Sequence, residues 1–260
     1  MAPAIKSIKR LHKHLKIEPS GGKFGCEYYL GKEGCRRSLR NKWGRNVDVV
    51  CGDWPYIGLE YGKARVSGKP MSVVVVGMDG GGRKKMNLRF PRRQKEWYEA
   101  IKGHNGKWDN AHVAGTNLAV RELVDDKDPE LFLRQFCYIN SVKCTPKAEG
   151  MSSMATAVTK ANCTNHLRRE LNELKPNLIV IEGRYPERII IHIYGLLRPA
   201  HQYKGGYRSR LYIESDKPIV LALPHPSARG IRSCILAGQL PPCYLKAINK
   251  VRSLWANKPT

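Results

Sequence analysis

The stretch MSVVVVGMDGG, residues 71–81, is the clearest indication of the fold, because four consecutive valines run into a glycine-rich turn. The stretch NLIVIEG, residues 177–183, has the same character. Nearly continuous runs of Val, Ile and Leu are typical of strands that are buried on both faces of a parallel sheet. With two further apolar runs, the sequence predicts four strands: Ser72–Val76, Phe136–Val142, Asn177–Ile181 and Pro218–Leu223.

Helical patterns lie between these runs and after the last of them. They cover Arg93–Lys102, His112–Val124, Ala155–Leu174, Pro186–Leu197 and Pro241–Ala256. Strands that alternate with helices imply right-handed crossovers between parallel strands. The predicted fold class is therefore α/β, a three-layer α/β/α sandwich with a central, mostly parallel, four-stranded sheet.

Residues 1–70 are different: they are rich in Gly, Lys, Arg and aromatic residues, with three cysteines and little periodicity. Without a cross-link, such a stretch would struggle to offset the conformational entropy lost on folding. We expect an irregular basic layer at 1–70, pinned by metal to an α/β/α domain at 71–260. Two later segments, Gly80–Pro91 and His201–Arg210, are expected to be loops.

The chain is strongly basic, with 46 Lys and Arg against 22 Asp and Glu and a net charge of +24. A field of that sign attracts polyanions, and nucleic acid is favoured over an anionic membrane surface or an acidic protein. No apolar run reaches the ~18–20 residues that span a bilayer, and the basic start lacks the apolar core of a secretory signal. We expect a monomer in a reducing compartment, cytoplasmic or nucleoid-associated.

Eight cysteines are spread along the chain. Because disulfides are disfavoured in a reducing compartment, these residues are either metal ligands or buried thiols. The chain has no C-x2-C pair and no zinc-finger spacing, so the pattern alone does not fix a metal.

Polar residues follow or end three of the predicted strands. Asp79 comes after the first strand, Asn140 lies in the second, and His225 follows the fourth. Since the carboxyl ends of parallel strands meet at one edge of a sheet, these side chains can converge. An Asp can activate water, an Asn can read a base edge, and a His can stabilise charge on an oxygen. Taken singly, each could instead be a turn, strand-end or loop residue.

Three motifs resemble those of the uracil-DNA glycosylase superfamily: GMDGG after VVVV, YINSVKC, and HPS after VLAL. YINSVKCTP, followed by a helix that contains Cys163, is similar to the iron–sulfur-containing bacterial and archaeal branch, as is LNELKPNLIVIEG. The resemblance covers roughly Pro70–Arg229. It implies a DNA glycosylase that hydrolyses the N-glycosidic bond of uracil or another deaminated base in base-excision repair.

The resemblance also implies roles for single residues. Asp79 matches the residue that positions water, and His225 matches the one that supports the leaving base anion. Asn140 matches the residue that reads the base, and Phe90 is the counterpart of the ring that stacks on it, although it could also be a loop anchor. The same motifs place further residues against the substrate: Gly77, Met78, Gly80 and Ser227.

Cys144 and Cys163 match two ligands of the branch's 4Fe-4S cluster. Cys51 and Cys35 are our choice for the upstream pair, with Cys26 as the alternative to Cys35. The chain departs from the branch here, because its upstream cysteines are not closely spaced, and structural zinc on the same thiolates stays open. We expect core packing for the others: Cys137, Cys234 and Cys243.

Two basic segments are candidates for contact with single- or double-stranded DNA. SARGIR, 227–232, carries Arg229 and Arg232, and HQYKGGYRSR, 201–210, carries Lys204 and Arg208 among aromatic residues. The alternative for the second segment is a solvated loop. For the whole chain, the alternatives are a non-catalytic iron–sulfur nucleic-acid-binding protein of the same fold and a hydrolase acting on a nucleoside or RNA.

A last departure from the family concerns substrate. The first motif has Gly80 and Gly81 where relatives carry Pro or Tyr, which predicts a roomier pocket and release of hypoxanthine or xanthine as well as uracil. The alternative is that these glycines only permit a tight turn, with Met86 or Phe90 closing the pocket.

Overall fold

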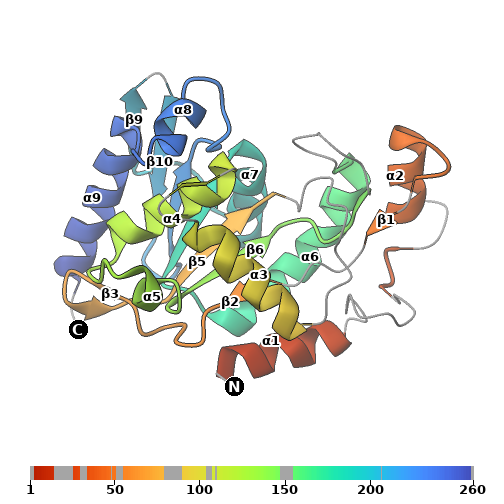
Figure 1. The fold of residues 1–260 in the computed structure, drawn as a ribbon, viewed down its shortest axis with the longest axis horizontal. Coiled ribbons are helices and arrows are strands. Elements are labelled where there is room, and N and C mark those ends of the chain that lie inside the picture. The colour runs from red at the N-terminus through yellow and green to blue at the C-terminus, as the bar shows by residue number, and fades with distance from the viewer. Residues whose placement is uncertain are drawn as a thin grey trace.

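The centre of the molecule is a sheet whose middle strands all run parallel (Figure 1). The computed structural model describes residues 3–14, 26–29, 34–47, 49–50, 55–78, 90–103, 107–108, 110–146, 155–205 and 207–258. Four parallel strands lie in the order β6-β5-β8-β11. They are β5 (Val73–Gly77), β6 (Phe136–Asn140), β8 (Leu178–Glu182) and β11 (Ile219–Leu223). The four strands predicted from the apolar runs are confirmed within two residues of their ends.

Antiparallel strands extend this sheet at both edges. Among the described residues it has seven strands in the order β2-β6-β5-β8-β11-β10-β9. The added strands are β2 (Tyr56–Ile57), β9 (His201–Gly205) and β10 (Tyr207–Tyr212). The prediction of a loop at His201–Arg210 is therefore wrong. Exposed and half-buried residues alternate along β9, and this period of two beside a Gly-Gly pair is the pattern of a β-hairpin.

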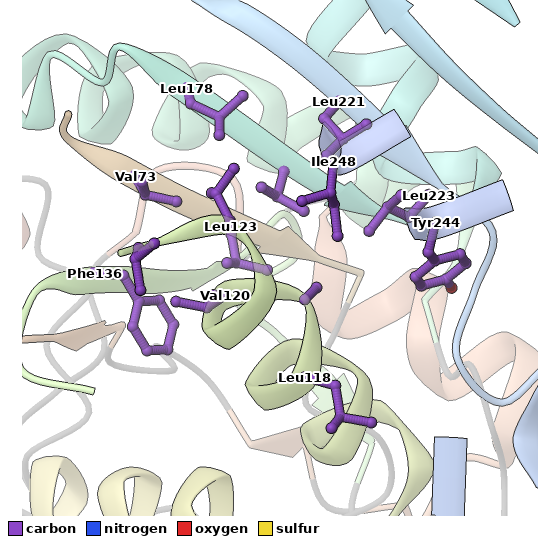
Figure 2. Packing of buried hydrophobic residues seen from close by; sticks show 14 of the residues in the cluster. Val73, Leu118, Val120, Leu123, Phe136, Leu178, Leu221, Leu223, Tyr244 and Ile248 are labelled. Atoms are coloured by element: carbon purple, nitrogen blue, oxygen red, sulfur yellow. The ribbon is translucent and has the colours of Figure 1, made fainter. Parts of the chain in front are cut away.

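One face of the sheet is covered by α3 (Phe90–Lys102), α4 (Ala111–Leu123), α8 (Arg232–Leu236) and α9 (Pro242–Ala256). Its core joins side chains of β5, β6, β8 and β11 to α4 and α9. Figure 2 shows Val73, Phe136, Leu178, Leu221 and Leu223 from the strands, with Leu118, Val120 and Leu123 of α4 and Tyr244 and Ile248 of α9. Successive strand residues point to opposite faces, so each parallel strand serves two cores.

The other face is covered by α1 (Pro3–His14), α6 (Ala157–Leu174) and α7 (Arg184–Tyr194). Ile5 and Ile8 of α1 are buried in the same core as Val74 and Ile179 of the strands. Helices on both faces of a mostly parallel sheet make the predicted three-layer α/β/α sandwich, which is thereby confirmed.

The remaining short elements are α2 (Cys35–Trp43), β1 (Val49–Val50), β3 (Arg65–Val66), β4 (Lys69–Pro70), α5 (Pro129–Phe132) and β7 (Thr145–Pro146). β1 pairs with β7, and α2 packs on α6 at one end of the molecule (Figure 1). The described part of 1–70 thus contains α1, α2 and the edge strand β2, more regular structure than expected. The division into 1–70 and 71–260 stays a prediction. No helix among the described residues is long and apolar enough to cross a membrane.

Candidate active site

The carboxyl ends of the four parallel strands lie at one edge of the sheet. Gly77, the last residue of β5, is in register with Asn140, the last residue of β6. Glu182 ends β8 in register with Leu223 of β11, and His225 follows two residues later. The predicted meeting of Asn140 and His225 at this edge agrees with the topology. Two more predicted site residues, Asp79 and Gly80, lie outside the described residues.

Hydrogen bonds beyond the strands hold Met78 beside the segment that follows Asn140. The backbone N–H of Ser141 donates to the carbonyl of Gly77 (2.9 Å), and that of Val142 donates to the carbonyl of Met78 (2.8 Å). The Ser141 hydroxyl also donates to the Met78 carbonyl (2.9 Å). The ends of β5 and β6 are therefore tied together where the first two motifs meet.

Asn140 is buried, and its side chain is held by a tyrosine. Tyr138 precedes it by two residues on β6, so both side chains lie on the same face of the sheet. The Tyr138 hydroxyl donates to Asn140 Oδ1 (3.1 Å). Sequence reasoning did not identify Tyr138, although its spacing from Asn140 on a strand was a usable signal.

Gly77 makes room for that tyrosine. A Cβ at position 77 would lie 1.9 Å from the Tyr138 hydroxyl oxygen and 3.0 Å from His112 Nε2. Real Cβ atoms do not approach other atoms that closely. The missing side chain of Gly77 therefore allows Tyr138 and His112 to meet, a role distinct from the predicted contact with substrate.

His112 comes from the first turn of α4, which begins after the N-cap Asn110; the Asn110 side chain accepts from the His112 N–H (2.8 Å). His112 Nε2 contacts the Tyr138 hydroxyl and lies 3.3 Å from Glu182 Oε2. Thr116, one turn along the same helix, donates to Glu182 Oε1 (2.9 Å). A chain of polar contacts thus runs from Thr116 and Glu182 through His112 and Tyr138 to Asn140.

Glu182 is the buried end of this chain, with 1 % of its surface exposed. Burial raises its pKa to about 8, while the hydrogen bond from Thr116 lowers it. Desolvation favours the neutral form of a carboxyl group, so Glu182 carries a proton near neutral pH. A carboxyl with a strongly shifted pKa at the carboxyl edge of a parallel sheet is a mark of a functional site.

His225 lies against this network. Its ring stacks on the His112 ring, with centroids 5.2 Å apart and an angle of 24° between the planes. Its Nδ1 accepts from the backbone N–H of Ser227 (3.1 Å). An imidazole that accepts at Nδ1 is neutral and carries its hydrogen on Nε2. His225 is therefore prepared as a hydrogen-bond donor.

Two glycines let neighbouring segments approach the His225 loop. Gly183 has φ +105°, and a Cβ there would lie 3.2 Å from His225 Cδ2. A Cβ on Gly115 of α4 would lie 2.6 Å from the Pro226 ring. The Tyr244 hydroxyl of α9 donates to the carbonyl of Pro224, just before His225. The HPS motif is thus fixed by α4, α9 and the β8–α7 turn.

The family model of the uracil DNA glycosylase superfamily matches residues 93–234 of this chain. The chain belongs to the uracil DNA glycosylase superfamily. The matched span includes the ends of β6, β8 and β11, and so Asn140, Glu182 and His225. A search of curated proteins found no match.

The superfamily resemblance was visible at Asn140 and His225, whereas His112 and Glu182 were missed. Glu182 had a signal, because it ends NLIVIEG as Asn140 ends its own strand. His112 had none in the local pattern, because a histidine in the first turn of a helix reaches the sheet edge only once the fold is known.

The basic residues predicted to bind DNA lie on one side of this edge. Lys204 and Arg208 are in register on the β9–β10 hairpin, and both are exposed. A Cβ on Gly230 would lie 3.6 Å from the Tyr207 ring, which places the hairpin beside the 227–232 loop. That loop carries three exposed predicted residues: Ser227, Arg229 and Arg232. In Figure 1, β9, β10 and α8 lie together.

Phe90 begins α3, but its side chain lies outside the described residues. Its proposed stacking on the base stays a prediction.

Four of the candidate metal ligands are buried at or near α6. They are Cys26, Cys35, Cys144 and Cys163. The pKa of Cys163 is raised to about 12, chiefly by burial and in part by Cys35 and Cys26, while the Lys143 N–H lowers it. On α6, the Asn162 side chain also donates to the Cys35 sulfur (3.4 Å). None of the described cysteines forms a disulfide.

The donor chemistry of these thiols fits an iron–sulfur cluster or zinc, both of which bind thiolates. Among the described residues, however, no three His, Cys, Asp or Glu side chains form a group that could hold a metal ion. Cys51, the remaining candidate, lies outside the described residues. Cys26 also contacts His166 Nε2 (3.2 Å). The ligand set therefore stays a prediction.

Cys137 and Cys243 lie in the two cores, and Cys234 is half-buried on α8.

Proposed function

We propose that this protein hydrolyses the N-glycosidic bond of uracil or another deaminated base in DNA. The observation that carries the proposal is that two groups at the same edge of the sheet are linked through His112. Asn140 is held by Tyr138, and His225 is held as a neutral donor on the ring of His112. This reaction needs a group that reads the base and a hydrogen-bond donor for the developing anion.

The reaction requires a base that has left the stack, because an enzyme cannot reach the bond inside a duplex. Asn140 would bind the edge of the extruded base, with Phe90 as its stacking partner. The exposed Lys204, Arg208, Arg229 and Arg232 would bind the phosphates on either side.

In the chemical step, the bond between sugar C1′ and the base nitrogen breaks, and its electron pair leaves with the base. The oxygen of a water molecule bonds to C1′, and the proton of that water passes to a carboxylate, for which the motif supplies Asp79. The base departs as an anion whose charge spreads onto its carbonyl oxygen. His225 Nε2–H donates to that oxygen, where charge develops in the transition state.

The experiment is an abasic-site assay on oligonucleotides that contain one uracil, hypoxanthine or xanthine. His225→Ala is expected to slow base release about 100- to 1,000-fold, by analogy with the loss of one oxyanion donor. His192→Ala is the matched control, because His192 is exposed on α7, and it should leave the rate unchanged. If the native protein releases none of these bases but binds the oligonucleotides, the protein is a binder without glycosylase chemistry.

We further infer a 4Fe-4S cluster, or zinc, held by Cys35, Cys51, Cys144 and Cys163, with Cys26 as the alternative to Cys35. When bound, it would supply a cross-link between the N-terminal segment and α6. The burial of the described thiols supports this. Purified protein should contain iron and sulfide in near-equal amounts, and Cys144→Ser should lower both. Protein that is colourless and contains zinc would remove the cluster and leave the zinc site.

A further inference from the structure

A surface cavity of about 930 Å³ lies between the N-terminal segment and α6, and it shares no lining residue with the candidate active site. Its polar and aromatic lining comes from the 26–29 segment, from α2 and from the first two turns of α6. These side chains are Tyr28, Arg37, Ser38, Asn41, Lys42 and Asn162. Cavities that receive small ligands have volumes of roughly 300–1,000 Å³, so this one is large enough for a nucleotide.

The helix α2 supplies the cations of this cavity. Its residues Cys35 and Leu39, four positions apart, are buried, and α2 packs on α6. From Cys35 to Arg45 the chain has no acidic residue, and Arg37, Lys42 and Arg45 are exposed. Like charges that are close together on a helix destabilise it, so an anion bound at this face would stabilise α2.

The charge of the lining is open to a ligand. Within the described residues, neither Arg37 nor Lys42 forms an ion pair with a carboxylate. Lys42 Nζ lies 4.9 Å from the centroid of the Trp43 ring, a contact that leaves its positive charge in place. Glu27 is exposed and also lines the cavity. Two cations against this carboxylate favour an anionic ligand.

Tyr28 is the aromatic member of the lining. Its hydroxyl accepts from the Asn165 side chain of α6 (3.3 Å), and its ring meets that of His166 at an angle of 61°. These contacts hold Tyr28 on α6, where it is half-buried. An aromatic ring beside cations suits a single strand of nucleic acid, because every base presents a flat face that can stack.

The cavity lies at the same edge of the sheet as the candidate active site. Since α6 follows β6 and returns to the start of β8, it begins at the carboxyl edge. Ser38 of α2 donates to the hydroxyl of Thr156, the N-cap of α6 (2.7 Å). In Figure 1, α2 lies at the right-hand end, whereas β9, β10 and α8 lie at the upper left. The cavity and the basic β9–β10 hairpin therefore flank the active site on different sides.

We propose that this cavity binds a nucleotide of single-stranded DNA, on the strand whose neighbouring base enters the active site; the choice of that strand rests on the proposed function. Arg37 and Lys42 bind its phosphates, and Tyr28 stacks on its base. A single strand is required, because the base faces of a duplex are already stacked on one another. Tyr28 and α2 precede the span matched by the family model, residues 93–234, so the cavity adds to the family's fold.

The test measures binding of an oligothymidylate of about 16 nucleotides, a length that one single-strand-binding domain covers. The strand holds no damaged base, so base release does not contribute. Arg37→Ala and Lys42→Ala should each lower the affinity and reduce the slope of log K against log salt concentration by about 0.7. Arg121→Ala and Lys63→Ala are the matched controls. Both residues are exposed, one near the end of α4 and one before β3, away from the carboxyl edge. They should keep the native slope.

Tyr28 offers a second pair of variants. Tyr28→Phe keeps the ring and should bind the strand with nearly native affinity. Tyr28→Leu removes the ring and should weaken binding about five- to hundred-fold, the range for one stacked base. The two α2 variants carry the test if Tyr28→Leu does not fold, because Arg37 and Lys42 are exposed.

Three outcomes overturn the inference. The first is an α2 variant with the native affinity and slope. The second is an equal loss of affinity for a blunt duplex of the same length, which would mean that α2 attracts phosphates without holding a nucleotide. The third is displacement of the strand by thymidine monophosphate at equal nucleotide concentration, which would make the cavity a site for free nucleotides. If the strand binds as described while uracil-containing oligonucleotides stay intact, the proposed reaction fails and the strand site stands.

Discussion

Two fully buried glutamates, Glu170 and Glu182, lie on opposite faces of the same sheet and behave in opposite ways. On α6, Glu170 Oε2 is 2.7 Å from Lys143 Nζ and Oε1 is 2.6 Å from His12 Nε2. Burial alone would raise its pKa, but Lys143 and His12 outweigh burial and hold it below the usual value. Glu182 instead keeps a pKa of about 8, because burial dominates there.

The difference in pKa reflects different roles: Glu170 cross-links two parts of the fold, whereas Glu182 belongs to the candidate active site. Lys143 follows β6, His12 belongs to α1, and Glu170 joins them, so the paired carboxylate fastens the N-terminal helix to the sandwich. Glu182 faces a histidine and a hydroxyl group at the strand edge that carries Asn140 and His225. A buried carboxyl that retains its proton can donate a hydrogen bond, whereas an ionised carboxylate that is bonded to a cation can only accept.

The largest expected effect follows the removal of one partner of Glu170. Lys143→Met leaves a buried carboxylate facing His12 alone and should lower the free energy of unfolding by about 3–5 kcal/mol. The double variant Lys143→Met with Glu170→Leu should recover most of that loss, because no buried charge remains. Urea unfolding at pH 7 measures both. A single variant as stable as the native protein would mean that the triad is not a cross-link.

Glu182→Gln should change how the stability of the protein depends on pH. The folded protein keeps the Glu182 proton up to about pH 8, while the unfolded chain loses it near 4.5. The stability associated with this proton is present below pH 4.5 and is lost as pH rises toward 8. The variant should therefore equal the native protein at pH 4.5 and exceed it at pH 8.5, on the order of 2–4 kcal/mol. A difference that does not change with pH would contradict the shifted pKa.

Much of the sandwich was predictable because its strands are buried on both faces. VVVV and LIVI can be recognised as strands from the local sequence alone. The helices between them can be recognised from their own helical pattern of apolar residues. The β9–β10 hairpin was missed because its inward residues are Tyr203, Tyr207 and Ser209, a weak apolar signal among basic residues. Its Gly-Gly centre was the feature that could have identified it.

The candidate site was predictable only where a residue lies at a strand end. Asn140 and His225 were predicted in this way, and the topology brings both to the same edge of the sheet. His112, which joins their surroundings, comes from a distant part of the chain, 26 residues before Tyr138; on the other face of the sheet, His12 lies 158 residues before its partner Glu170. A local pattern does not encode such pairs, because either partner alone has several ordinary interpretations.

A substitution at Gly77, near Glu182, should have a smaller effect on stability. Gly77→Ala places a Cβ 1.9 Å from the Tyr138 hydroxyl oxygen and should cost about 1–3 kcal/mol through overpacking. Adding Tyr138→Phe removes the atom nearest to that Cβ and should recover part of the loss. Thermal unfolding of both single variants and the double variant gives the coupling. Strictly additive effects would show that the two residues do not share this space.

The smallest expected effect concerns two exposed lysines, one near the Glu182 edge of the sheet and one near Glu170. If the Glu182 edge receives DNA, Lys204 on the hairpin should contact a phosphate, whereas Lys13, exposed on α1 beside the Glu170 triad, should not. Each phosphate contact releases counterions, so Lys204→Ala should reduce the slope of log K against log salt concentration by about 1. Lys13→Ala, with the same change of charge, should leave the slope unchanged. The measurement is oligonucleotide affinity across a salt series. Equal slopes for the two variants would mean that DNA responds to the total charge of the chain, and that the basic hairpin beside the His225 loop is not the binding face.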